Sequence, residues 1–459
     1  MKLKIFLYLI IVNILLCQPI PKDFIGFYKK KLMIDSGKNW FQNSIFGPPR
    51  MNNQQDMTDS LIIISRLGLK TLSNGKSFYG FGNFTYNKYF HGYLYSRIVN
   101  HPELFERFSG IQRDINRFGF TAGETDQSGI CFENNWLTFQ FGRGRESWGA
   151  GNDIQLGLYE NSNPYDYGML DLDFGKLKVR YFNGYLETDS LEISRYISGR
   201  GIEWNNEKNI LLGLSEVVVY SGKNRTLDFS YLNPISTHLE IELNDKQNNL
   251  GTDNGNGIWQ VSIDYLFLYR FKISFNYLMD EIVLDKVQKN ANKSSQGGFS
   301  FKIVHSPSFF KGDNSSNIYA SFVKISTNTF RHEDGNNNFV VRDKPLGWPH
   351  GSDGREFKLG FDSFTSKYNL LVRTCFGRRD LGSNSIIESP YIGYTNYISV
   401  PFPSGNYQKV IFFQSDLQWW YKPYISLRVK MEHYKTKNQL ISGNFKTGID
   451  IYFPVAAKI

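Results

Sequence analysis

Residues 259–277 read WQVSIDYLFLYRFKISFNY, a stretch in which apolar and polar side chains alternate with a period of two. The odd positions hold Trp259, Val261, Ile263, Tyr265, Phe267, Tyr269, Phe271, Ile273, Phe275 and Tyr277. The even positions include Gln260, Ser262, Asp264, Arg270, Lys272, Ser274 and Asn276. A helix would mix the two sets on one face, whereas a strand keeps them on opposite faces. The stretch predicts one long strand, or two strands joined by a tight turn.

The same alternation recurs along the chain, which predicts an all-β protein. It is clearest over residues 235–243, 425–432 and 445–453, and shorter versions surround Phe301, Tyr319, Phe357, Leu370 and Phe413. The protein is rich in aromatic residues, with 38 Phe and 28 Tyr among 459 residues. Its mean hydropathy is nevertheless −0.38, as expected for strands with one apolar and one polar face.

The N-terminus has the pattern of an export signal. Lys2 and Lys4 precede an apolar run from Ile5 to Leu16 that is too short to span a bilayer. We therefore expect residues 1–17 to be a signal peptide, cleaved near Cys17. After Leu16, no stretch approaches the ~20 apolar residues of a membrane helix, which leaves an exported soluble protein or a β-barrel.

Three features favour the barrel over a soluble β-protein. Tyr and Phe recur at the ends of the apolar faces, as the aromatic girdles of a barrel require. Short turns alternate with long polar stretches, such as 244–257, 285–298 and 331–356. An aromatic strand at 445–453 lies near the C-terminus, where outer-membrane assembly machinery is thought to read such a strand. The sequence thus predicts an antiparallel β-barrel in the outer membrane, in contact with its lipids and assembled by that machinery.

The domain boundaries follow from these patterns. After the signal peptide, residues 18–58 form a segment that lies on the periplasmic side or plugs the lumen. The barrel occupies residues 59–453, which gives room for about 16–18 strands. Residues 454–459 form a C-terminal tail.

Several function classes find little support in the residues. Cys131 and Cys375 are far apart in the sequence, and their spacing gives no support for a disulfide between them. The chain has no CxxC motif. We expect no metal and no cofactor. Ser147 lacks the flanking glycines of a nucleophile elbow, and phosphate-binding motifs are missing, so we expect no enzyme. Basic residues are spread along the chain, which argues against nucleic acid as a partner.

Four motifs occur in an order that resembles one known family. Residues 137–168 read LTFQFGRGRESWGAGNDIQLGLYENSNPYDYG, followed by LLGLSEVVVY at 211–220, YLNPISTHLE at 231–240 and KPLGWPHGSDG at 344–354. Together they resemble the Wzi family of outer-membrane capsule-assembly proteins, over roughly residues 59–453. The resemblance implies a barrel of about eighteen strands with a helical N-terminal part. It also implies a non-enzymatic lectin that tethers exported polysaccharide to the cell.

The residues offer chemistry for such binding. The net charge is +9, or +7 without Lys2 and Lys4, which favours an acidic polysaccharide through charge-assisted contacts. The candidate binding residues are Arg143, Arg145, Glu146, Trp148, Glu216, Arg342 and Trp348. Four of them also have a plainer interpretation: Trp148 as a packing or girdle residue, Arg143 and Glu146 as a lumen ion-pair network, and Glu216 as the partner of a lumen arginine.

The glycines and the function of the barrel each leave a choice between two interpretations. Gly142, Gly149 and Gly151 are expected to serve turn geometry rather than ligand contact. A porin for small anionic solutes is the alternative to the polysaccharide tether, and it would need an open lumen ringed by charge.

Overall fold

The computed structural model describes residues 19–48, 61–114, 118–244, 255–283, 286–307, 315–394, 400–436 and 442–458, apart from positions 23, 39, 88 and 269. Within these residues, eighteen antiparallel strands close into one barrel through the pairing of β2 with β22. The barrel prediction is confirmed, and the count lies at the upper end of the predicted range. The expected signal peptide lies outside the described residues.

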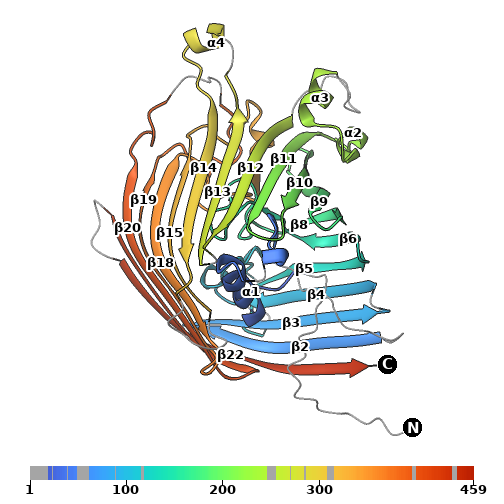
Figure 1. Cartoon of the computed structure of the whole chain (residues 1–459), viewed down its shortest axis with the longest axis vertical. Coiled ribbons are helices and arrows are strands. Elements are labelled where there is room, and N and C mark those ends of the chain that lie inside the picture. The colour runs from blue at the N-terminus through green and yellow to red at the C-terminus, as the bar shows by residue number, and fades with distance from the viewer. Residues whose placement is uncertain are drawn as a thin grey trace.

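The wall strands follow chain order around the barrel (Figure 1). They are β2 (Leu61–Leu72), β3 (Gly75–Tyr86), β4 (Phe90–Val99), β5 (Ala122–Glu133), β6 (Leu137–Gly144), β8 (Tyr165–Asp173), β9 (Leu177–Thr188), β10 (Ile193–Asn205), β11 (Ile210–Lys223), β12 (Gly255–Phe267), β13 (Phe271–Glu281), β14 (Gln296–His305), β15 (Ser315–Ile325), β18 (Gly354–Thr365), β19 (Leu370–Leu381), β20 (Gln408–Lys422), β21 (Ile425–Thr436) and β22 (Ser442–Lys458).

Short elements lie in the connections. Two small ladders pair β1 (Phe46–Gly47) with β7 (Ser147–Trp148), and β16 (Val340–Val341) with β17 (Lys344–Pro345). The helices are α1 (Ile25–Asp35), α2 (Phe229–Leu232), α3 (His238–Leu243) and α4 (Lys286–Asn290). Three 3₁₀ turns cover Trp40–Gln42, Pro102–Leu104 and Gly335–Asn337. None of the described helices is long and apolar enough to cross a membrane.

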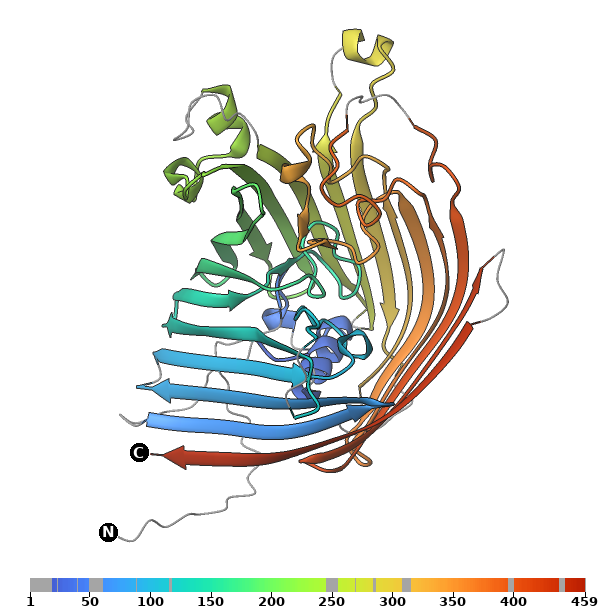
Figure 2. The same ribbon diagram turned by 180° about the vertical axis from the view of Figure 1, so that it is seen from behind.

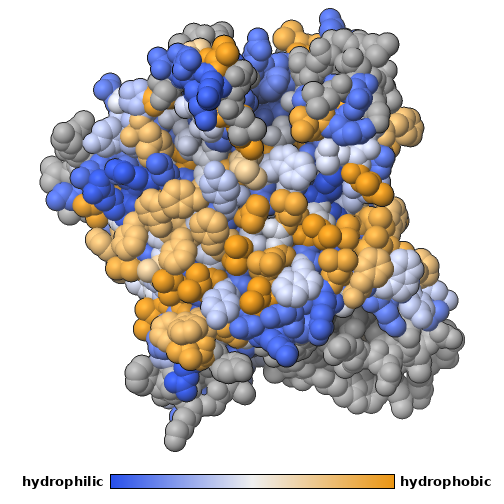
Figure 3. Space-filling view, turned by 45° about the horizontal axis from the view of Figure 1, so that its top comes forward, coloured by the Kyte–Doolittle hydropathy of each residue, from blue (hydrophilic) through white to orange (hydrophobic). Residues whose placement is uncertain are grey.

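The alternating stretch 259–277 forms two strands, β12 and β13, joined at 268–270. Phe267 pairs with Phe271 across this hairpin. On β12 the even side chains, such as Gln260 and Asp264, are buried in the lumen, while Tyr265 and Phe267 are exposed on the outside. Repeated around the wall, this pattern produces the apolar band of Figure 3. A closed barrel with an apolar exterior and charged interior is the outer-membrane arrangement.

The two ends of the barrel differ. The six longest connections, 100–121, 145–164, 224–254, 282–295, 326–353 and 382–407, all leave the same end, which we call the loop end. The other end, the turn end, carries shorter turns together with the start of β2 and the close of β22. Bacterial barrels have short periplasmic turns and longer extracellular loops, so the loop end faces the cell exterior.

The structure differs from the expected one in the C-terminal boundary of the barrel and in one predicted strand. Residues 454–458 continue β22, which pairs with β2 as far as the Ile62–Lys458 partners. The prediction of a strand over 235–243 is wrong, because α3 occupies 238–243. The helix begins with a Thr-x-x-Glu capping pattern, in which the Thr237 side chain accepts from the Glu240 N–H at 3.2 Å. This local signal prevails over the alternation.

The N-terminal segment lies within the ring of strands (Figure 2). On α1, Phe27 and Leu32 are buried, and they belong to a cluster with wall residues that include Tyr79, Tyr95 and Trp420. Close approach to the wall depends on glycines. A Cβ at Gly213 on β11 would lie 2.0 Å from Ile45 Cδ1, so a larger residue would displace the segment.

A second apolar cluster fills the lumen toward the loop end. It joins residues of the 145–164 connection, such as Trp148 and Leu156, to Phe339 and Trp348 of the 326–353 connection. A packed interior of this kind is the core of a plugged barrel and differs from a water-filled pore. Cys131 on β5 and Cys375 on β19 are not bonded to each other.

Candidate functional site

Arg145 lies deep in the lumen, because the chain turns inward after β6. Its Nη2 lies 2.6 Å from Asp126 Oδ1 on β5, and its Nε donates to the Ser162 carbonyl at 2.8 Å. Arg107 and Arg97 approach the same Asp126 carboxylate at 3.1 and 3.8 Å. A buried carboxylate surrounded by guanidinium groups is a paired structural cluster, so Arg145 organises the plug and does not face outward.

Glu146 and Trp148 bind each other inside the same connection. Glu146 is buried and accepts from the Trp148 indole N–H at 2.8 Å, from the Tyr167 hydroxyl at 3.1 Å and from Arg180 at 3.2 Å. The Trp148 ring packs edge-on against Phe46 with centroids 5.0 Å apart. The ring is 1% exposed, which leaves no face for a sugar to stack on.

Trp348 is equally enclosed. Its backbone N–H donates to the Leu156 carbonyl at 2.9 Å, and its ring meets His350 edge-on at 5.0 Å. Burial lowers the pKa of His350 to about 3, and the nearby Arg379 charge adds to the effect. The imidazole is therefore neutral at physiological pH, and this part of the loop is packed as a core.

Arg143 and Arg342 lie at the surface of the loop end. Arg143 points outward from β6, and its Nη1 lies 2.8 Å from Asp166 Oδ2 on β8. Arg342 sits with Asp343 at the tip of the β16–β17 hairpin. Burial and the positive charge of Arg143 both lower the pKa of Arg342, which reflects how close the two guanidinium groups are. The tertiary structure thus brings together two candidates that are 199 positions apart in the numbering.

The hairpin tip has an unusual backbone. Arg342 has φ +46° and Asp343 φ +63°, the combination of a two-residue I′ turn that normally favours Asn or Gly. A non-glycine residue in the left-handed region costs ~1–2 kcal/mol. Asp343 and Lys344 are exposed, and Arg342 is partly exposed. The hairpin therefore presents Arg342, Asp343 and Lys344 to the exterior, and we call these three residues together with Arg143 the basic rim.

A buried ion pair holds the rim in place. Arg195 on β10 pairs with Glu187 on β9. Glu187 accepts from the Arg342 N–H at 3.1 Å and from the Tyr391 hydroxyl at 2.9 Å, while Arg195 donates to the Asn338 carbonyl at 2.6 Å. This pair ties the 326–353 and 382–407 connections to the wall. Sequence reasoning missed this role, since the loop residues that the pair binds, Asn338, Arg342 and Tyr391, are far from it in the chain.

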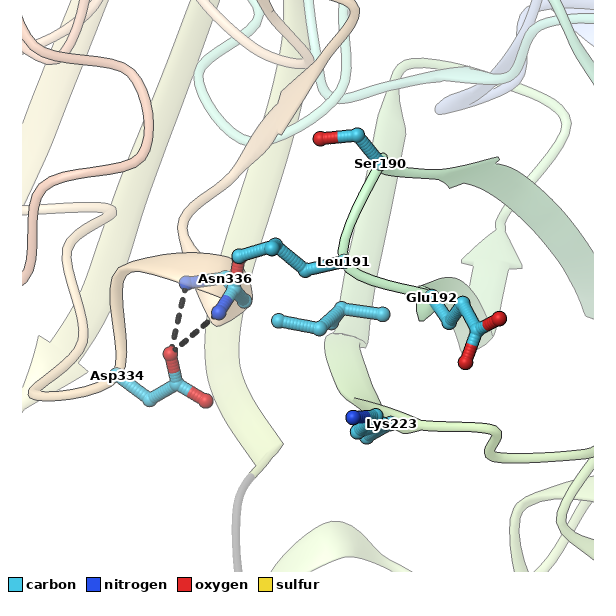
Figure 4. Close-up of a pocket in the computed structure, with 8 residues that line it drawn as sticks. Ser190, Leu191, Glu192, Lys223, Asp334 and Asn336 are labelled. Atoms are coloured by element: carbon cyan, nitrogen blue, oxygen red, sulfur yellow. Dashed lines mark hydrogen bonds between the residues drawn. The ribbon is translucent and has the colours of Figure 1, made fainter.

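An open groove of about 550 Å³ lies beside this pair (Figure 4). It is lined by Ser190, Leu191, Glu192, Lys223, Asp334 and Asn336, among others. The Asp334 carboxylate is oriented by two bonds of 3.0 Å from the backbone and side-chain N–H groups of Asn336. An exposed leucine among hydroxyl, amide and charged groups offers both the apolar and the polar contacts that sugars use.

Glu216 lies on the outside of the barrel. The prediction that it pairs with an arginine in the lumen is therefore wrong. Its neighbours Leu212 and Leu214, which share its face of β11, are exposed on the outer wall. Glu216 pairs with Arg200 on β10 at 3.2 Å and accepts from the His238 N–H at 3.1 Å. It is buried because residues 224–244, which we call the outer flap, cover it.

The three glycines serve different purposes. Gly149 and Gly151 have φ of +137° and +70°, so both give the chain its turn into the lumen. Gly142 belongs to strand β6, and its φ does not fall in the left-handed region. A Cβ there would lie 2.1 Å from the Ser128 carbonyl oxygen, so Gly142 allows close approach of β5 instead.

Among the described residues, no group of three or more His, Cys, Asp or Glu side chains is arranged to hold a metal ion. No protein-family model matches the chain, and no curated protein sequence matches it.

Solved structures with the same architecture do match. Wzi of Escherichia coli, described as a carbohydrate-binding β-barrel involved in group 1 capsule assembly, superposes with a TM-score of 0.60 at 12% identity, covering 85% of this chain and 84% of Wzi. This chain is similar in fold to Wzi. The resemblance inferred from the four motifs is thereby confirmed for the fold.

Porins of Pseudomonas aeruginosa match less well. OprD superposes with a TM-score of 0.46 at 10% identity, covering 86% of this chain and 95% of OprD. OccK3 gives 0.45 at 8% identity, with coverage of 86% and 95%. The closed wall with its apolar exterior makes this chain an outer-membrane β-barrel, the class of protein to which Wzi belongs.

Proposed function

We propose that this protein is a non-enzymatic outer-membrane barrel that binds an exported, acidic polysaccharide through the basic rim and the adjoining groove. The observation that carries the proposal is that Arg143 and Arg342, both partly exposed, lie near enough at the loop end for the charge of Arg143 to act on Arg342, above a packed lumen. Arginine forks bind carboxylates in a bidentate way, and Arg143 uses only one of its amino groups on Asp166. Wzi, which is similar in fold, binds carbohydrate.

The buried candidates take a supporting part in this proposal. Arg145, Glu146, Trp148 and Trp348 build the plug on which the hairpin rests, and Glu216 anchors the outer flap. Contact with polysaccharide then falls to Arg143 and Arg342. The exposed Leu191, in the groove, supplies an apolar surface against which sugar C–H groups pack.

The test uses a host strain in which the coding gene is deleted and complemented. Cell-bound and shed surface polysaccharide are measured separately for wild type, for the R143A/R342A variant and for a K176A/K208A control. The control removes the same charge from exposed positions in the turns at the opposite end. We expect the deletion strain and the rim variant to shed material that wild type and control retain, with total output unchanged.

Two outcomes would refute the proposal. If the deletion strain keeps an unchanged cell-bound fraction, the protein does not tether polysaccharide. If the rim variant retains polysaccharide as wild type does, the basic rim is not the binding site. The porin alternative is tested by measuring the conductance of the purified protein in planar bilayers. We expect no steady conductance, because an apolar cluster packs across the lumen. Open-channel conductance in the wild type would favour the pore.

A further inference from the structure

The outer flap covers polar residues on the outside of the barrel wall. Tyr181 on β9 and Ser198 on β10 both donate to the Tyr231 carbonyl of α2, at 2.8 and 3.2 Å. Arg200 donates to the Asn233 carbonyl at 3.2 Å. Arg200 and Ser198 share the face of β10 on which Ile202 and Trp204 are exposed. The flap therefore lies against the outer wall, outside the lumen (Figures 1 and 2).

The contact between flap and wall is specific. Tyr231 stacks on Tyr220 of β11 with ring centroids 4.3 Å apart, and its hydroxyl lies 3.0 Å from His238 Nδ1. His238 fits against glycines of β12, because a Cβ at Gly257 would lie 2.4 Å from its ring. Ile241 of α3 is fully buried in the same cluster. The wall is shaped to receive the flap, so the flap has a fixed position.

The opposite face of the flap is apolar and uncovered. Phe229 is 74% exposed and Ile235 is 86% exposed, and Leu227 and Leu239 are exposed as well. The wall directly toward the turn end carries the exposed belt residues Leu212 and Leu214 of β11. At the flap, the outer wall carries polar side chains such as Ser198, Arg200 and Glu216 beside the apolar Tyr220, and the flap covers them. The exposed apolar side chains of the flap thus belong to the same outer side of the wall as the membrane-contacting belt.

We propose that this face of the outer flap, formed by Leu227, Phe229, Ile235 and Leu239, inserts into the outer leaflet of the membrane at the boundary between acyl chains and headgroups. Apolar residues on short helices beside a barrel wall bury favourably at this depth. The occupant is lipid, because the surface adjoins the belt that lipid already covers. This inference does not depend on the proposed polysaccharide tether.

The test measures the depth of a fluorophore on the flap. A bimane is attached to F229C in a C17S/C131S/C375S background, and the full chain is reconstituted in phosphatidylethanolamine–phosphatidylglycerol vesicles. Quenching is compared between a lipid with a nitroxide near the glycerol end of its acyl chain and aqueous iodide. L214C on β11 serves as the belt control and E192C in the groove as the solvent control, and I235C provides a second flap position if F229C does not fold.

Support for the inference is a blue-shifted emission at 229 that lipid nitroxide quenches and iodide does not, as at 214. Iodide quenching like that at 192 would overturn it. Protection from both quenchers, together with self-quenching that rises with the protein-to-lipid ratio, would also overturn it and indicate a second copy of the chain on this face.

Discussion

Arg200 and Glu216 stand directly opposite each other on β10 and β11, with Arg200 Nε 3.2 Å from Glu216 Oε2, on the face of the wall that elsewhere meets lipid. A lone arginine facing the bilayer midplane costs ~2–4 kcal/mol. Here each charge neutralises the other, and the outer flap separates both from the membrane. The ion pair and the flap therefore depend on one another.

Replacing Glu216 with leucine should destabilise the barrel. E216L leaves the Arg200 charge buried without its carboxylate and removes the acceptor of the His238 N–H. Breaking one side of a buried pair costs about 3–5 kcal/mol of unfolding free energy. Urea unfolding in lipid vesicles, followed by tryptophan fluorescence, measures the loss.

The R200L/E216L double variant is the matched control for this prediction. It removes both charges and leaves an apolar pair of similar size, so most of the lost stability should return. A single variant as stable as wild type would contradict the account of the pair.

Replacing Arg342 with glycine should separate stability from binding. Glycine removes about 1–2 kcal/mol of left-handed strain but adds about 0.5–1 kcal/mol of chain entropy to the unfolded state, for a net gain of about 0.5–1 kcal/mol. The backbone N–H bond to Glu187 remains. We expect R342G to unfold at higher urea while it retains less polysaccharide on cells.

R342K is the informative comparison for this site. It keeps the positive charge and the strained turn but loses the planar fork, so stability should match wild type while retention falls partway. Full retention in R342G would show that the side chain does not contact the polymer.

Substituting Trp148 with phenylalanine tests whether this ring is structural. W148F removes the indole N–H and leaves Glu146 with one donor fewer in the buried lumen. Glu146 keeps its bonds from Tyr167 and Arg180, and one hydrogen bond to a charged group contributes about 1.5–3 kcal/mol. We expect a lower urea midpoint and unchanged polysaccharide retention. A loss of retention without a loss of stability would instead make Trp148 a ligand contact.

His350 should make the folded state sensitive to acid. Burial lowers its pKa from the usual 6.5 to about 3, so the folded protein resists a proton that the unfolded chain accepts. Its contribution is complete above pH 6.5 and declines as the pH falls toward 3. The loss between pH 7.5 and pH 5 is about 1–2 kcal/mol, discounted for its partial exposure.

The comparison of H350Q with wild type isolates this effect from other titrating groups. We expect the two urea midpoints to shift by different amounts between pH 7.5 and pH 5, with the smaller shift in H350Q. Equal shifts would mean that the imidazole is not excluded from protonation.

The alternation of side chains was enough to predict an all-β protein, because a period of two is a local property that each strand shows alone. The aromatic girdles, the long polar connections and the aromatic strand near the C-terminus were needed to favour the barrel. The pattern over 259–277 predicted strand structure there and left one strand or two open, and the structure has two, β12 and β13. The same reasoning went wrong over 235–243, where a short alternating run competes with the Thr237–Glu240 capping pattern. Over so few residues, periodicity is weaker than a hydrogen-bonded cap.

The direction of each candidate side chain depended on contacts between distant segments. Arg143 and Arg145 are two residues apart, yet one faces outward on β6 and the other pairs with Asp126 in the lumen, because the wall ends at Gly144 and the chain turns inward. The sequence alone predicted the barrel and its long loops, and the export signal at residues 1–17 stays a prediction. Only the tertiary structure decided which charges are buried, since burial depends on what packs over a residue and not on its neighbours in the chain.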